Sequence, residues 1–307
     1  MESILIFALG VLCAGFGGEL FVRGAVGIAR RARVSPGLVA ATVAAFATSS
    51  PELAVSLTAA LSGAPQIALG DALGSNVVNL ALVLGLVLST AGMRSARAEH
   101  RRDFLFAAGV PLLVGLLARD GRLSRADAAV LLAAFVLWLL TVLREARRQR
   151  AAAPDATHGG DWRTPAAALA GLLLLLAAGT LIVRGATAIA LALGVDAFLI
   201  GATVVAIGTS VPEIATAAVA RLRGHDEVGL GALLGSNIFN GLFVVGIAAG
   251  LAPIALVPGE IGVALVVCLL ATAMAWPRHD GRLPRSRGVL LLGLYAAYLY
   301  AMLLVAP

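Results

Sequence analysis

Apolar segments long enough to cross a lipid bilayer recur along the whole of this chain. Hydrophobic residues make up 60% of the 307 residues and charged residues only 13%, whereas a soluble domain carries about 25% charged residues. A bilayer core about 30 Å thick is crossed by a helix of roughly 20 apolar residues. The chain is therefore predicted to be an all-α, multi-pass integral membrane protein with no sizeable soluble domain. Ten transmembrane helices are predicted, at about 3–22, 35–61, 67–90, 104–118, 126–143, 165–183, 197–221, 228–250, 258–276 and 288–305.

Arginines gather in alternate turns between these segments. They are dense after the first, third, fifth, seventh and ninth segments and sparser after the others, with Arg119, Arg122, Arg125 and Arg184 as exceptions. Because basic loops stay on the cytoplasmic side, both termini are predicted to lie outside and the polar stretch 144–164 in the cytoplasm. The net charge of +6 belongs to these turns, so we expect a lipid bilayer and no nucleic acid as partner.

The sequence aligns with itself after a shift of 161 residues. No gap is needed between residues 18 and 85, and 31 of these 68 positions are identical. ATSSPE at 47–52 falls on GTSVPE at 208–213, and GSNVVN at 74–79 falls on GSNIFN at 235–240. The shift predicts two five-helix repeats, 1–143 and 165–307, joined by a cytoplasmic linker at 144–164. Because five is odd, the second repeat is inverted, an architecture in which transporters place their site at the bilayer midplane.

Two glutamates, Glu52 and Glu213, occupy matched positions in the middle of apolar segments. A charge at that depth costs roughly 2.5–3.5 kcal/mol, and an intramembrane ionisable residue is by default a candidate functional group. The alternative is a structural carboxylate that is protonated or hydrogen-bonded between helices.

Hydroxyl and amide side chains accompany each glutamate. Spacings of three and four residues place the Thr, Ser and Glu of each motif on one helix face. With no His or Cys among them, such an all-oxygen set suits hard cations such as Ca²⁺ and Na⁺. Helix packing would explain these residues singly, but explains their duplication less well. They are Thr48, Ser49, Ser75 and Asn79 in the first repeat and Thr209, Ser210, Ser236 and Asn240 in the second.

Proline and glycine add expectations about the backbone. Pro51 and Pro212 free the carbonyls four residues earlier, at Ala47 and Gly208, because proline has no N–H. Glycine before each Ser-Asn pair, at positions 74 and 235, permits close approach or a break in the helix.

The remaining charged groups are weaker candidates. Asp71 has an apolar counterpart, Ala232, so a structural role is favoured over a vestibule site. Glu19 and Arg23 are predicted to form a local ion pair. The histidines, at positions 100, 158, 225 and 279, are all expected in loops.

The two duplicated motifs resemble the alpha repeats of the Ca²⁺/cation antiporter superfamily, and specifically those of prokaryotic sodium/calcium exchangers. The resemblance covers the whole chain in helix number and layout. It implies a core of segments two, three, seven and eight, crossed by long, tilted first and sixth helices, in a prokaryotic inner membrane. It also implies Na⁺ and Ca²⁺ as transported substrates, no cofactor, and function as a monomer.

The resemblance also implies roles for individual residues. Glu52 and Glu213 would bridge the central ion positions, with Thr48 and Thr209 contributing to Ca²⁺. Flanking Na⁺ positions would be lined by Ser75, Ser236 and the carbonyls of Ala45 and Ala206, which lie about half a turn before those that the prolines indicate. Asn79 and Asn240 would complete the middle position. Several relatives look to have Asp where this chain has Asn240, and this difference disfavours K⁺ co-transport.

Three other functions compete with Na⁺/Ca²⁺ antiport. An exchanger of H⁺ for Ca²⁺, or for another divalent cation, would use the same fold, with protons titrating the two glutamates. An intramembrane enzyme would need a nucleophile with a base or metal ligands, and the serines have neither His nor Lys nearby. A passive channel commonly builds its pore from several subunits, whereas this site is complete within one chain. The sequence therefore favours a transporter over an enzyme.

Overall fold

The computed structural model describes residues 2–63, 65–95, 97–152, 163–192, 206–256, 258–278 and 280–305. These residues are helical apart from turns and four two-residue strands, which pair antiparallel as β1 with β4 and β2 with β3. The elements are α1 (Glu2–Ala32), α2 (Pro36–Val39), η1 (Ala40–Ala44), α3 (Ala45–Thr48), α4 (Ser50–Leu61), α5 (Pro65–Val77), η2 (Val78–Val83), α6 (Leu84–Ala91), β1 (Met93–Arg94), α7 (Arg97–Leu117), η3 (Ala118–Asp120), β2 (Arg122–Leu123), α8 (Arg125–Ala152), α9 (Arg163–Ala192), α11 (Ala206–Thr209), α12 (Val211–Leu222), α13 (Asp226–Ile238), η5 (Phe239–Val244), α14 (Val245–Leu251), β3 (Ile254–Ala255), α15 (Pro258–Ala275), β4 (Arg282–Leu283) and α16 (Arg285–Val305).

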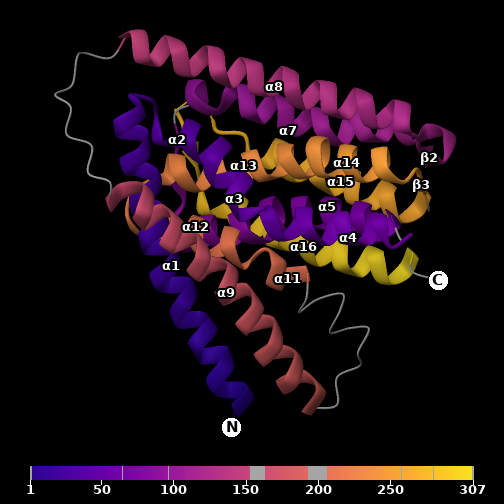
Figure 1. Ribbon diagram of the computed structural model, residues 1–307, viewed down its shortest axis with the longest axis horizontal. Coiled ribbons are helices and arrows are strands. Elements are labelled where there is room, and N and C mark those ends of the chain that lie inside the picture. The colour runs from indigo at the N-terminus through magenta and orange to yellow at the C-terminus, as the bar shows by residue number, and fades with distance from the viewer. Residues whose placement is uncertain are drawn as a thin grey trace.

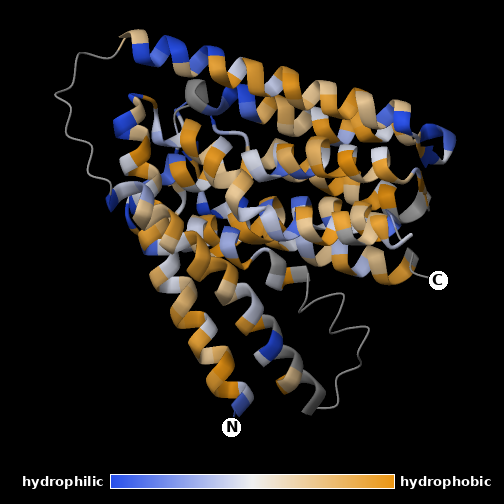
Figure 2. Ribbon diagram, viewed as in Figure 1, coloured by the Kyte–Doolittle hydropathy of each residue, from blue (hydrophilic) through white to orange (hydrophobic). Residues whose placement is uncertain are grey.

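The helices have the length and composition of membrane spans. Within the described residues, six helices are long and apolar enough to cross a bilayer, or seven if the bent pair Pro36–Thr48 and Ser50–Leu61 is one span. Figure 2 shows apolar residues along the helices and many of the hydrophilic ones near their ends. The prediction of an all-helical membrane protein is confirmed, while ten helices in two inverted repeats stay a prediction.

The two halves share their local structure around the duplicated motifs. The bounds of α3, α4, α5 and η2 recur in α11, α12, α13 and η5 after the same offset of 161 residues. The elements of one half also pack on those of the other, since α13 contacts α2, η1 and α3 while α5 contacts α11 and η5. The duplicated motifs are therefore brought together at an interface between the halves.

The single helix predicted at 35–61 is broken at Ser49. Its two parts, α2–α3 and α4, meet at a bend of 41°. Ser49 has φ −86° and ψ 12°, and its repeat mate Ser210 has φ −86° and ψ 7°. Proline two residues later cannot donate the next helical hydrogen bond, which accounts for a break at the same place in both halves.

Wider π-helical turns follow the Gly-Ser-Asn motifs. η2 and η5 are π-helical at matched positions and contain Asn79 and Asn240, respectively, and η1 is a further π-helix just before α3. Such turns are rare and are found most often at functional sites. No sequence signal predicted them, because propensity does not distinguish a π-turn from an α-turn.

Helix α1 runs antiparallel to α9, and both are set at an angle to the other long helices (Figure 1). The pair is in close backbone contact because glycines face it: a Cβ on Gly171 would lie 2.4 Å from the backbone nitrogen of Phe21, and one on Gly24 would lie 2.6 Å from Ala168 Cα. Helix α1 extends ten residues beyond the predicted segment, to Ala32, so that Arg23 lies inside the helix.

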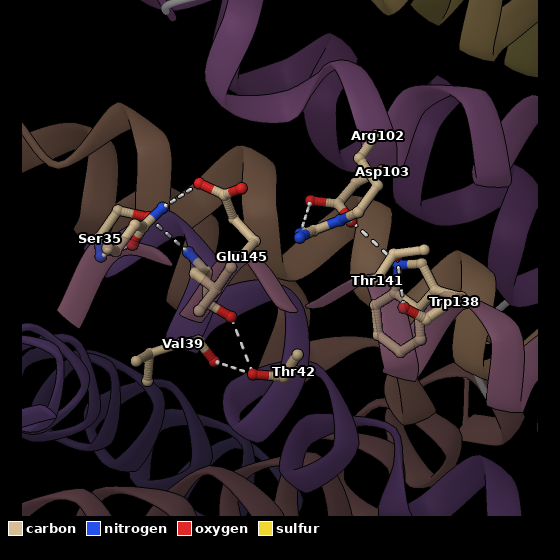
Figure 3. Close-up of polar contacts among 10 residues, drawn as sticks. Ser35, Val39, Thr42, Arg102, Asp103, Trp138, Thr141 and Glu145 are labelled. Atoms are coloured by element: carbon tan, nitrogen blue, oxygen red, sulfur yellow. Dashed lines mark hydrogen bonds and ion pairs between the residues drawn. The ribbon is translucent and has the colours of Figure 1, made fainter. Parts of the chain in front are cut away.

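Helix α8 extends to Ala152 and thus includes the first nine residues of the predicted linker. Gln149 accepts a hydrogen bond from the Ser35 backbone N–H (2.8 Å) and donates one to Glu145 (3.0 Å). Earlier in α8, Trp138 Nε1 donates a hydrogen bond to Asp103 of α7 (3.0 Å), as Figure 3 shows. Residues 144–152 are therefore a packed helix that holds the start of the broken helix. The rest of the linker lies largely outside the described residues.

Gly171→Ala is expected to lower the stability of the protein by about 1–3 kcal/mol, because the new methyl group would overlap backbone atoms of α1 that cannot rotate away. Thermal unfolding in detergent measures the loss. Gly15→Ala on α1 is the matched control, because nothing lies within 4 Å of a Cβ at that position. Equal melting temperatures for the two variants would contradict the close packing of α1 on α9.

Candidate cation site

Glu52 and Glu213 are each buried in the first turn of a helix that begins at a break. Glu52 is the third residue of α4 and Glu213 the third residue of α12, and each is 1% exposed. The N-terminal end of a helix carries a partial positive charge that stabilises a nearby carboxylate. The broken helices therefore offset part of the cost of burying the two charges.

Glu213 receives hydrogen bonds from both halves of the chain. Ser49 Oγ of the first half (3.2 Å) and Ser236 Oγ of the second half (3.3 Å) both donate to Glu213 Oε1. Thr48 also lies within hydrogen-bonding reach of Glu213. Thr48 and Ser49, which were predicted to share one helix face with Glu52, thus also reach the glutamate of the other half.

Glu52 lies beside Ser75 and close to Glu213. Ser75 of α5 hydrogen-bonds to the Glu52 carboxylate, and the negative charge of Glu213 acts on Glu52. The two glutamates thus form one cluster in which like charges face each other in a region of low dielectric constant. Such an arrangement is stable only if a cation or a proton reduces the repulsion.

Two asparagines that the sequence analysis did not single out connect the halves. Asn76 Nδ2 donates to the Asn237 carbonyl (3.0 Å), and Asn237 Nδ2 donates to the Asn76 carbonyl (3.1 Å). Asn79 Nδ2 donates to Asn237 Oδ1 (3.1 Å). Both residues belong to the duplicated GSN triplet, so their matched positions were the signal that could have identified them.

Several buried oxygen atoms of the predicted set have no hydrogen-bond partner among the described residues. Leaving a buried polar group unpaired costs about 1–3 kcal/mol, so this many in one cluster points to a ligand. Asn240 is unpaired at both its oxygen and its nitrogen. The oxygens are Glu52 Oε2, Glu213 Oε2, Asn79 Oδ1, Asn240 Oδ1 and Ser210 Oγ.

The backbone carbonyls differ from the proline-based expectation. The carbonyl of Ala47, which Pro51 frees, accepts a hydrogen bond from the Ser50 hydroxyl. The Ala45 carbonyl accepts the Ser49 N–H (3.0 Å) and the Thr48 hydroxyl (3.4 Å). The Ala47 carbonyl therefore already accepts a hydrogen bond from a residue of its own turn.

In the second half, the structure describes part of the predicted set only at the backbone. Ala206 and Thr209 lie in α11, but their side chains are not described. The Gly208 carbonyl faces α9, because a Cβ on Gly179 would lie 3.1 Å from its oxygen. Gly235 permits a close approach of α13 to η1, because a Cβ added to it would lie 2.1 Å from the Ala41 carbonyl oxygen. A Cβ added to Gly74 would have only the Tyr298 hydroxyl within 4 Å, at 3.9 Å. Neither glycine breaks its helix.

The other ionisable residues that the sequence analysis considered have contacts of their own. Glu19 pairs with Arg23, as predicted, and also with Arg223 of the second half (2.7 Å). His100 is not in a loop: it lies in the first turn of α7 and is buried. His225 precedes α13 and lies 3.4 Å from Glu227, whereas positions 158 and 279 lie outside the described residues.

The family described as "Sodium/calcium exchanger protein" matches the chain over residues 2–144 and 164–304. Among curated relatives, a putative antiporter CaxA from Alkalimonas amylolytica is 35% identical over 98% of this chain and 99% of its own. The inner membrane protein YrbG of Escherichia coli is 31% identical over 99% of this chain and 92% of its own.

A solved structure of the sodium-calcium exchanger NCX_Mj, soaked with Na⁺ and Sr²⁺, superimposes on the chain with a TM-score of 0.83. The sequences are 29% identical, and the match covers 97% of this chain and 98% of the other. The similarity therefore extends over both halves and includes the candidate site.

Asn237→Ala is expected to destabilise the protein by about 2–3 kcal/mol, because it leaves the Asn76 carbonyl and Asn79 Nδ2 buried without partners. Thermal unfolding in detergent again measures the effect. Gln66→Ala removes an exposed amide from α5 and should leave the melting temperature within about one degree of the native value. A native melting temperature for Asn237→Ala would contradict a role in joining the halves.

Proposed function

This chain belongs to the sodium/calcium exchanger protein family, and we propose that it is a secondary active antiporter that exchanges Na⁺ for Ca²⁺ across the membrane. The observation that carries the proposal is the cluster of buried, unpaired oxygens around Glu52 and Glu213. Ca²⁺ takes six to eight oxygen ligands, and the cluster supplies carboxylate, amide and hydroxyl oxygens from both halves.

The charge of the cluster is suited to exchange. Two carboxylates are neutralised by one Ca²⁺ or by two Na⁺, so either ion relieves the repulsion between Glu52 and Glu213. The two ions therefore compete for one site, and an unloaded site is unfavourable to close. Because the two ions share one site and the empty site does not close readily, the protein carries one ion across the membrane and returns only with the other ion bound.

The proposed ligands follow the resemblance. Glu52 and Glu213 hold the central ions, with the two threonines contributing to Ca²⁺ and the asparagines completing the middle position. The serines and two carbonyls line the Na⁺ positions. The full set comprises Glu52, Glu213, Thr48, Thr209, Ser49, Ser210, Ser75, Ser236, Asn79, Asn240 and the carbonyls of Ala45 and Ala206.

The transport cycle that we propose is alternating access between two inverted five-helix repeats, with ten membrane spans and both termini outside. The matched local structure of the two halves supports it, because pseudo-symmetric halves can adopt inward-open and outward-open forms of similar energy. The described glycine contacts also support α1 and α9 acting as one paired unit. We propose that a single chain is sufficient for transport.

The coupling ion is tested with the purified protein in proteoliposomes. Vesicles loaded with Na⁺ and diluted into Na⁺-free buffer should accumulate ⁴⁵Ca²⁺, because outward Na⁺ flow drives Ca²⁺ inward. A pH gradient imposed without Na⁺ should drive no uptake. Uptake with the pH gradient alone would establish the alternative, exchange of H⁺ for Ca²⁺, and reject Na⁺ as the coupling ion.

Glu213→Gln should reduce Na⁺-driven ⁴⁵Ca²⁺ uptake at least about tenfold, because one of the two charges that neutralise Ca²⁺ in a region of low dielectric constant is lost. Glu227→Gln is the matched control: it makes the same change at the start of α13, where the carboxylate pairs with His225, and should transport at the native rate. Native transport by Glu213→Gln would reject the assigned site.

A further inference from the structure

The hairpin of α4 and α5 brings a third carboxylate to the level of Glu52. The two helices are antiparallel, and Ser56 Oγ of α4 donates to the Ala68 carbonyl of α5 (3.4 Å), which fixes their register. One turn along each helix from this contact, Glu52 lies opposite Ala72. Asp71 is the neighbour of Ala72, so it lies near the same level as the glutamate.

Asp71 has the environment of a ligand more than that of a surface charge. Its Oδ2 atom is buried and has no hydrogen-bond partner among the described residues. Its negative charge acts on Glu52, and it lies four residues before Ser75, which hydrogen-bonds to the same glutamate. Asp71 as a residue is half-buried. An unpaired carboxylate oxygen buried within a membrane span is unfavourable, and a cation shared with Glu52 would remove that cost.

The second half of the protein has no equivalent group. The repeat mate of Asp71 is Ala232, which is 1% exposed and apolar. The third carboxylate is therefore present on one side of an otherwise duplicated site. Because Asp71 lies between the α4–α5 connection and Ser75, it is nearer than Ser75 to the membrane face on which that connection lies.

We propose that Asp71 is a cation-binding side chain that forms, with Glu52 and Ser75, an access site for Ca²⁺ on one face of the membrane only. The proposal rests on the proposed function and adds to it a binding residue and a direction. Under the proposed topology the face is the extracellular one. A Ca²⁺ ion entering from that face meets Asp71 before it reaches the two glutamates, whereas an ion entering from the other face meets no matching carboxylate in the second half.

The proposal is tested by comparing the two faces of the membrane. Right-side-out and inside-out membrane vesicles are loaded with Na⁺, and ⁴⁵Ca²⁺ uptake is measured over a range of outside Ca²⁺ concentrations. Asp71→Asn should raise the half-saturating Ca²⁺ concentration about tenfold in right-side-out vesicles, because one carboxylate is lost from the access site. In inside-out vesicles the half-saturating concentration should change less than twofold. Asp71→Glu, which keeps the charge, should recover most of the affinity.

Asp120→Asn is the matched control. It removes an exposed carboxylate from the turn after α7, on the same predicted face, and should leave both half-saturating concentrations at native values. An unchanged affinity of Asp71→Asn on both faces, or an equal loss on both faces, would overturn the proposal while the native protein still transports. Absence of Na⁺-driven uptake by the native protein would instead reject the proposed function, and the access site with it.

Discussion

The structure depends on keeping two like charges, Glu52 and Glu213, buried next to each other. In a region of low dielectric constant their repulsion and desolvation both oppose folding. Two features reduce the cost: each carboxylate lies in the first turn of a helix, and hydroxyl groups from both halves donate to Glu213. One oxygen of each glutamate remains without a protein partner, and this part of the cost is left for a ligand to remove. The break at Ser49 creates the helix end that Glu52 occupies.

The halves are also joined by contacts that do not use the glutamates. Asn76 and Asn237 exchange hydrogen bonds with each other's backbone, and Gly235 lets α13 pack directly on the backbone of η1. These contacts are made between protein groups alone, although Asn76 Oδ1 has no partner among the described residues. The interface between the halves therefore has contacts that do not involve the two glutamates.

The sequence predicts the apolar segments, the polar turns between them and the repeat. It does not predict where a helix bends. Duplication identified Glu52 and Glu213, and hydropathy located the apolar segments to within several residues. The prolines indicated a freed carbonyl but not the break at Ser49, and the π-helical turns were not predicted because propensity does not distinguish them from α-turns. The hydrogen bond from Ser49 to Glu213 was not predicted either, because it joins halves that are distant in sequence. Glu145 and Gln149 were expected in a linker because they are polar. They lie instead in helix α8, where Gln149 accepts a hydrogen bond from the backbone N–H of Ser35, the residue before α2.

A perfectly symmetric pair of repeats would bind ions equally from both sides and would favour neither access state. The asymmetries of this chain are therefore as informative as its duplication. Ser50 caps the carbonyl that Pro51 frees, but its repeat mate is Val211, which has no hydroxyl for Gly208. The residue that corresponds to Asp71 in the second repeat is likewise apolar, namely Ala232. Ser50 lies inside a duplicated motif and Asp71 three residues before one. Under our proposal the matching positions form the common ion site, and the positions that do not match make its two entrances different.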